Sequence, residues 1–235
     1  MKRPIILLAG LFAAALAQGG ESPSQLFFEV HRDGESVGSH CLKFTRQGDQ
    51  LEVEVGMELQ VQLPLWFDYR YRYRALERWQ DGRLAALDVR IEDGSKQRRI
   101  EARRRAGALE VEAPGGTWRL PGNLLTSNHW NPAALEQGEL LNTLTGRASR
   151  IDSQYLGADR LPFGEAELDV RRYRLGGDLE DTVVWYDGSG GWRGLEFSAR
   201  DGSRVRLKPR QGDSLAFSQS PWNRNPLCRP GQRSG

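Results

Sequence analysis

Residues that could do chemistry are concentrated in one short segment, residues 127–131, which reads Ser-Asn-His-Trp-Asn. His129 could act as an acid, a base or a hydrogen-bond donor, because imidazole titrates near neutral pH. Trp130 could stack on a ligand and Asn131 could orient a polar group. The structural alternative has a serine or asparagine capping a turn, the tryptophan filling the core and the histidine bonded to backbone. Both interpretations stay open on the sequence alone.

A second candidate is an alternating segment, residues 66–79, which reads WFDYRYRYRALERW. Side chains alternate across a β-sheet, so Tyr69, Tyr71 and Tyr73 share one face and the intervening arginines share the other. Buried tyrosine hydroxyls need polar partners. We therefore expect a tyrosine-rich inner face, with a slightly polar lining, that could hold a ligand.

The preceding segment, residues 51–61, alternates in the same way between glutamates and aliphatic residues. A hairpin between the two segments would set Glu58 opposite Arg70 or Arg72 and the aliphatic row opposite the tyrosines. Cross-strand pairs of opposite charge contribute about 0.2 to 1 kcal/mol each. The arginines thus have local partners and need no polyanion.

Other candidates for chemistry are weaker. Trp185 lies in an aromatic segment around a turn, residues 183–192, and joins the candidate ligand-binding set as its last member. That set is Tyr69, Tyr71, Tyr73, His129, Trp130, Asn131 and Trp185. The three histidines and two cysteines have no metal-ligand spacing, and no phosphate-binding or nucleophile-elbow motif is present. We expect no metal, no cofactor and no catalytic residue that a motif identifies.

The elements that must position these residues are β-strands. Asp-Gly pairs at 33–34, 81–82, 93–94, 187–188 and 201–202 separate segments of period two, and such pairs are strong hairpin signals. The pattern predicts an all-β protein with a large antiparallel sheet. A sheet of about ten strands must curl or close to cover its apolar face, so we expect a half-barrel or barrel, with a β-sandwich as the alternative.

The chain divides into four expected parts. Residues 1–17 read as a signal peptide cleaved after Ala17, residues 18–25 as a flexible N-terminus, and residues 209–235 as a Pro-rich tail. Residues 26–208 form a single β domain, interrupted at residues 121–146 by an irregular insertion that crosses or plugs the sheet. The signal peptide predicts a periplasmic or secreted protein.

Charge argues against nucleic acid as a partner. Without residues 1–17, the chain has 31 basic and 31 acidic residues, whereas nonspecific nucleic-acid binding needs a positive excess. A basic cluster at residues 96–105 reads as a solvated strand, or as a contact for anionic lipid headgroups or another acidic surface.

Cys41 and Cys228 are the two cysteines, and an exported protein can join them. Cys41 alternates with Leu42 and Phe44, which places it on the outer face. A disulfide there would fix the tail against the outside of the sheet. Two unpaired thiols remain the alternative, because the spacing decides neither.

A set of short motifs resembles a bacterial exported family of unknown function, the one numbered 6134. The most distinctive is Ser127-x-His129-Trp130-Asn131, and the others lie around Asp33-Gly34, Trp79-x-Asp81-Gly82, Trp185-Tyr186-Asp187 and Asp201-Gly202-Ser203. The resemblance covers residues 26–208 and implies no activity. The strand-rich plan is also loosely similar to periplasmic lipoprotein-carrier half-barrel proteins, an analogy of architecture.

The sequence thus favours a periplasmic protein that binds an apolar or amphipathic ligand, a lipid or small amphiphile, without catalysis. One alternative is a hydrolase or isomerase that uses His129 as acid/base. Another is an envelope-assembly scaffold that touches a protein partner or the membrane surface through Arg98 and its basic neighbours. Oligomeric state is not predicted.

Overall fold

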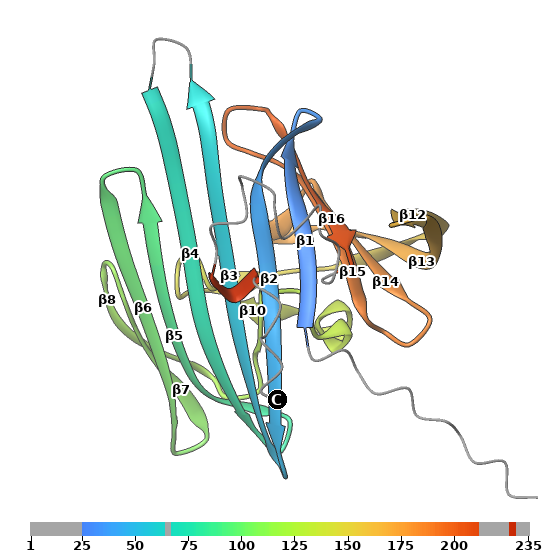
Figure 1. Cartoon of the computed structure of the whole chain (residues 1–235). Coiled ribbons are helices and arrows are strands. Elements are labelled where there is room, and N and C mark those ends of the chain that lie inside the picture. The colour runs from blue at the N-terminus through green and yellow to red at the C-terminus, as the bar shows by residue number, and fades with distance from the viewer. Residues whose placement is uncertain (1–24, 64–66, 212–225, 229–235) are drawn as a thin grey trace, which may run out of the picture.

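The computed structural model describes residues 25–63, 67–211 and 226–228. The expected signal peptide, the residues that follow it up to position 24, and most of the Pro-rich tail lie outside these residues. Strands predominate, as the period-two segments predict (Figure 1).

Thirteen strands form one antiparallel sheet in the order β12-β13-β14-β15-β16-β1-β2-β3-β4-β5-β6-β7-β8. The N-terminal strands of this sheet are β1 (Gln25–Arg32), β2 (Glu35–Gln47), β3 (Gln50–Leu63), β4 (Phe67–Gln80), β5 (Arg83–Asp93), β6 (Lys96–Arg105), β7 (Ala108–Ala113) and β8 (Gly116–Pro121). The C-terminal strands are β12 (Ser153–Phe163), β13 (Ala166–Leu175), β14 (Thr182–Asp187), β15 (Trp192–Ser198) and β16 (Arg204–Arg210), with the short 3-10 helix η2 (Gly177–Leu179) between β13 and β14.

Hairpins connect most neighbouring strands, and the Asp-Gly pairs make several of the turns. Asp33 and Gly34 have φ angles of 49° and 93°, and Asp81 and Gly82 have 50° and 69°. Two successive positive φ angles match the right-handed twist of the flanking strands, and glycine adopts them without steric cost.

The two halves of the sheet meet at β1, which pairs with β2 on one side and with β16 on the other. The sheet ends at β12 and β8, and these two edge strands do not pair with each other. The architecture is therefore a single curved, open sheet: the expected half-barrel, rather than a closed barrel or a two-sheet sandwich.

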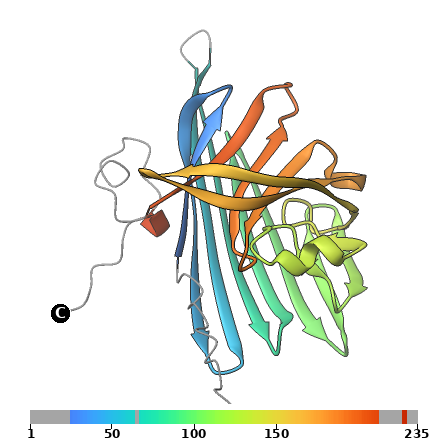
Figure 2. The same ribbon diagram turned by 90° about the vertical axis from the view of Figure 1, so that its right-hand side faces the viewer.

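The insertion occupies the inner face of this sheet. It contains β9 (Leu125–Thr126), the 3-10 helix η1 (Pro132–Glu136) and β10 (Glu139–Leu141), and it continues past the expected end at residue 146 into β11 (Ala148–Arg150), which forms a small second sheet with β9 and β10. Figure 2 shows this segment against the lower part of the large sheet. Leu140 and Leu141 have no exposed surface, so the insertion completes the main core. Its strands are only two or three residues long, too short for periodicity to reveal.

A smaller core lies on the opposite face of the C-terminal strands. The β12–β13 hairpin runs across the other strands (Figure 2), and Leu161, Val170 and Trp185 form a separate buried cluster there. This hairpin covers the outer side of β14, whose inner side belongs to the main core.

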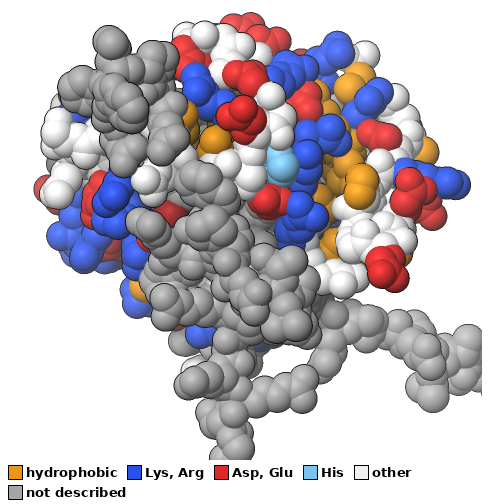
Figure 3. Space-filling model, turned by 45° about the horizontal axis from the view of Figure 1, so that its top comes forward, with side chains coloured by type: hydrophobic (Ala, Val, Ile, Leu, Met, Phe, Trp, Pro, Cys, Tyr) orange, Lys and Arg blue, Asp and Glu red, His pale blue; other side chains and the backbone are white. Residues whose placement is uncertain are grey.

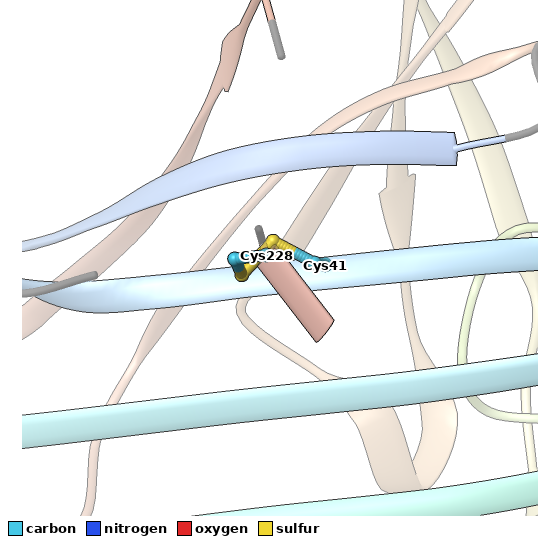
Figure 4. The surroundings of a disulfide bond; sticks show 2 residues. All are labelled: Cys41 and Cys228. Atoms are coloured by element: carbon cyan, nitrogen blue, oxygen red, sulfur yellow. A yellow bond between two sulfur atoms is a disulfide. The ribbon is translucent and has the colours of Figure 1, made fainter. Parts of the chain in front are cut away.

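A disulfide joins Cys41 on β2 to Cys228 in the 3-10 helix η3 (Pro226–Cys228) (Figure 4). Both cysteines are fully buried, and Phe27 and Leu227 pack around them. Of the two states that the sequence leaves open, the structure has the bonded one. The bridge connects residues 187 positions apart and fixes part of the C-terminal tail to the outside of the sheet.

Candidate functional site

The inner face of β2 to β5 carries most of the candidate site, and strand register determines which side chains are neighbours. One inner row runs from His40 to Met57 to Tyr73 to Ile91. The next row, toward the projecting end of the β3–β4 hairpin, runs from Gly38 to Leu59 to Tyr71 to Asp93. The tyrosines therefore meet the aliphatic row, as the alternation predicts.

Charged side chains pair on the outer face of the same strands. Glu58 lies opposite Arg72, with 3.7 Å between the Arg72 Nε and the Glu58 carboxylate, and Arg74 approaches the same carboxylate at 3.3 Å. The arginines alternating with the tyrosines thus find their counter-charges within the sheet, in agreement with the hairpin register expected from the sequence.

The lower half of the inner face is organised around Glu77, a fully buried carboxylate on β4. Its Oε2 accepts hydrogen bonds from the indole nitrogens of Trp79 at 3.0 Å and Trp130 at 2.7 Å. Its Oε1 accepts one from Asn128 Nδ2 at 2.6 Å. One side chain of the sheet thereby holds two side chains of the insertion.

The network continues from Asn128 to Tyr73. The Tyr73 hydroxyl donates to Asn128 Oδ1 at 2.8 Å, and the Thr143 hydroxyl donates to the same oxygen at 3.3 Å. Tyr73, Asn128 and Thr143 are all buried. Tyr73 is thus a structural link between sheet and insertion rather than a free ligand contact.

Burial raises the pKa of Glu77, because removal from water disfavours the charged carboxylate. Hydrogen bonds from Thr126, Asn128, Trp130 and Trp79 oppose that rise. These groups form a buried hydrogen-bond network, in which donors from the insertion take the place of water around the Glu77 carboxylate.

Glu77 was not among the site residues predicted from the sequence. A signal was present, because Glu77 has the parity of Tyr73, Ala75 and Trp79 and is the acidic residue in that inward row. A charged residue on the apolar parity of a strand predicts a buried polar network or a site.

The half of the inner face nearer the projecting end is not covered in this way. Met57, Leu59, Val61, Tyr69 and Tyr71 are all partly exposed, whereas Val53 and Val55, lower on the same parity of β3, are buried. We call these five residues the open inner face. β3 and β4 reach beyond their neighbours here (Figure 1), where residues 60–63 of β3 pair with residues 67–70 of β4.

The edge of the open inner face is polar. The Tyr69 hydroxyl donates to Asp93 Oδ1 at 2.6 Å, and Arg98 lies 3.4 Å from the same carboxylate group. Burial raises the pKa of Tyr71 to about 12, an effect that nearby Arg98 opposes and Asp93 reinforces. The tyrosine hydroxyls here are therefore neutral hydrogen-bonding groups.

An aromatic cluster lies beside the open inner face, on the other side of Met57. The His40 ring lies 6.0 Å from that of Phe28 and 5.6 Å from that of Trp192, which His129 approaches at 6.3 Å. Burial, with a smaller contribution from His129, lowers the pKa of His40 to about 3. Burial also lowers the pKa of His129 to about 4, so both rings are neutral at physiological pH.

The structure separates the remaining candidates. Asn131 caps η1, with its Oδ1 accepting from the Ala133 backbone N–H at 3.1 Å. Trp185 belongs to the outer cluster, where its indole donates to Asp159 at 2.9 Å, whereas Tyr71 and Tyr73 belong to the main core. His129 has a φ angle of +60°, and its carbonyl accepts a hydrogen bond from the Tyr186 hydroxyl at 2.7 Å.

The basic cluster of β6 is largely paired within the chain. Arg99 contacts Asp88 at 2.8 Å, and Arg105 lies 3.5 Å from Glu110. Figure 3 shows acidic and basic side chains interspersed on the face that it presents, with hydrophobic side chains between them. A single-sign patch of the kind that a polyanion would select is therefore not evident on that face.

The described residues contain neither a metal-binding cluster nor a membrane-spanning helix. No group of three or more histidine, cysteine, aspartate or glutamate side chains in this part of the chain is arranged to hold a metal ion. Within the same residues, no helix has the length and hydropathy needed to cross a membrane.

Comparisons with known proteins identify a family and a fold. A crystal structure of a beta-barrel-like protein of the domain of unknown function DUF1849 from Brucella abortus matches with a TM-score of 0.57 and 10% sequence identity, covering 80% of this chain and 95% of that one. At this identity the likeness shows the fold alone. The curated proteins contain no match. The model of a domain of unknown function, DUF6134, matches residues 28–210, from β1 to the end of β16, and the chain therefore belongs to the DUF6134 family.

Proposed function

We propose that this protein is an exported, non-enzymatic binding protein that holds an apolar or amphipathic ligand against the open inner face. The observation that carries the proposal is the contrast in burial along β3. Val53 and Val55 are buried, near the point where Trp130 of the insertion packs against Phe44 and Trp79, whereas Met57, Leu59 and Val61 are partly exposed. Burying apolar surface contributes about 25 cal/mol per Å², so this row would gain from an apolar ligand.

The polar edge favours an amphipathic ligand over a pure hydrocarbon. Tyr69 and Tyr71 present hydroxyl-bearing rings beside the aliphatic residues, with Asp93 and Arg98 at the margin. Ligand sites in proteins combine an apolar lining with a few placed polar groups. A molecule with an alkyl part and a small polar group would match this distribution.

Export is supported by the leader-like sequence at residues 1–17 and by the disulfide. Disulfides persist in oxidising compartments and are rare in the bacterial cytosol. A periplasmic location would give the protein access to envelope lipids and their fragments.

The two other hypotheses have less support. An acid/base role for His129 needs a carboxylate or hydroxyl that tunes the imidazole, but burial is the cause that lowers its pKa. A scaffold that binds through the basic cluster of β6 would compete with the ion pairs that Arg99 and Arg105 already make.

The test is native mass spectrometry, followed by organic extraction, on protein purified from the organism that produces it naturally. We expect a co-purifying amphiphile that is lost in Tyr71→Ala and retained in Tyr155→Ala. Tyr155 is the matched control because it is 55% exposed and lies on β12, in the other half of the sheet. Trp130→Ala is unsuitable, since Trp130 holds Glu77 and its loss would loosen the fold.

A wild-type protein that is free of bound molecules after gentle purification, and that binds no amphiphile added back, would overturn the proposal. Equal loss of the ligand in both tyrosine variants would also contradict it, because binding would then not depend on the open inner face.

A further inference from the structure

His40 is a buried polar side chain with no partner. It is 5% exposed, and neither of its ring nitrogens has a hydrogen-bond partner among the described residues. An unsatisfied buried donor or acceptor is costly, so such groups in native proteins call for a specific explanation.

The surroundings of His40 are aromatic and uncharged. Phe28 and Trp192 contact each other with ring centroids 4.5 Å apart, and both flank the imidazole. The titratable group that acts on His40 through space is His129, itself held neutral by burial. A neutral imidazole offers one N–H donor and one nitrogen acceptor.

The position of His40 connects it to the open inner face. Its cross-strand neighbour on β3 is Met57, the first residue of that surface. The next inward position on β2 toward the projecting end is Gly38, which pairs with Leu59 and contributes no side chain. A Cβ at Gly38 would lie 2.0 Å from the Glu58 carbonyl oxygen, so the close approach of β2 and β3 requires glycine. No β2 side chain therefore stands between His40 and the residues proposed to bind the alkyl part.

We propose that His40 is the polar anchor of the ligand site, and that it binds an uncharged hydroxyl group carried by an alkyl chain that lies on the open inner face. This inference rests on the proposed function and specifies its ligand class. A hydroxyl donates one hydrogen bond and accepts one, which matches both nitrogens of a neutral imidazole.

A carboxylate would match less well. It accepts hydrogen bonds but donates none, so it would satisfy the N–H and leave the other nitrogen of His40 facing a negative charge. Arg98, a cation on this inner face, pairs with Asp93 and lies four strands away from His40 along the same row. Aligned strands are about 4.8 Å apart, so the separation is about 19 Å.

The experiment compares two isomers, 1-decanol and nonyl methyl ether, which have the same atoms and nearly the same apolar surface. The ether accepts a hydrogen bond but cannot donate one. We expect the wild-type protein to bind 1-decanol about tenfold more tightly than the ether. His40→Phe keeps an aromatic ring in the cluster and should make the two affinities equal.

A direct readout comes from histidine ring ¹⁵N chemical shifts, because the chain has only three histidines. Adding 1-decanol should shift both ring nitrogens of His40. His31 is the internal control, since its Nδ1 lies 3.0 Å from the Gly34 carbonyl oxygen on the outer face. Near-UV circular dichroism checks that His40→Phe is folded, and His40→Leu replaces it if the larger ring does not fit.

The outcomes are distinguishable. Equal binding of both isomers by wild type and variant would overturn the role of His40 and leave the proposed function standing. No binding of either isomer would overturn both. His40 signals that report a bound water and do not respond to 1-decanol would also overturn this inference.

Discussion

The two halves of the inner face share strands and alternation but differ in how their polar groups are satisfied. In the lower half, Glu77 accepts hydrogen bonds from Trp79, Trp130 and Asn128, and the insertion excludes water. In the half nearer the projecting end, Tyr71 remains partly exposed, and beside this half the buried His40 has no hydrogen-bond partner among the described residues. The insertion therefore completes a core in one region, while the apolar and tyrosine side chains of the other region stay partly exposed.

The largest expected effect on stability comes from removing Glu77, the acceptor for the buried donors of the lower half. Glu77→Leu would leave the indole N–H groups of Trp79 and Trp130 and the amide of Asn128 buried without their acceptor. We expect a loss of about 3 to 5 kcal/mol in the free energy of unfolding, measured by urea denaturation.

The control for Glu77 is Glu54→Leu on the outer face, where the carboxylate is 40% exposed and pairs with Lys43. This variant should change stability by less than about 0.5 kcal/mol. If Glu77→Leu cost no more than Glu54→Leu, Glu77 would not be the link between sheet and insertion.

The burial of His40 should make the stability of the protein depend on pH. Its folded pKa is about 3, below the ordinary value of 6.5. Between these values the unfolded chain binds more protons than the folded chain, so stability falls as the pH is lowered through 6.5 toward 3. The slope attributable to His40 approaches about 1.4 kcal/mol per pH unit.

His40→Phe should remove that component of the slope, because phenylalanine does not titrate. Urea denaturation of wild type and variant at pH 7, 6 and 5 measures the difference. Parallel stability curves would show that His40 is already protonated or solvated in the folded protein.

The smallest expected effect compares two tyrosines on one parity of β4. Tyr73→Phe removes a buried hydroxyl that donates to Asn128 and should cost about 1 to 2 kcal/mol. Tyr71→Phe, two residues away, should cost less than about 0.5 kcal/mol, because its side chain is partly exposed. Thermal unfolding of both variants tests the difference, and equal losses would show that the two halves are packed alike.

The alternation of β3 and β4 could be predicted from the sequence, because one face of these strands is charged and the other is apolar or aromatic. Glutamate and arginine occupy the outer parity, aliphatic residues and tyrosine the inner one, and the observed pairing of Met57 with Tyr73 belongs to one of the two registers that this alternation allows. The Asp-Gly turns were equally clear, since the backbone conformation at Asp33-Gly34 is one that few other residue pairs adopt.

The candidate site was harder to predict, because its members come from distant segments. Trp185 and Trp130 are similar in the sequence, yet one lies on the outer face against Asp159 and the other lies inside against Glu77. Periodicity tells which residues share a face of one strand. It does not tell which faces meet when a sheet of thirteen strands curves.

By itself, the sequence determined the longer strands, several of their turns and which side chains share a face along each strand, because these depend on local alternation and on glycine conformations. Only the tertiary structure decided that β1 joins β2 to β16, that the insertion seals one half of the inner face, and that His40 comes to lie beside Trp192 without a polar partner. The physical reason is that burial and hydrogen-bond satisfaction are properties of groups brought together across the whole chain, and no local pattern encodes them.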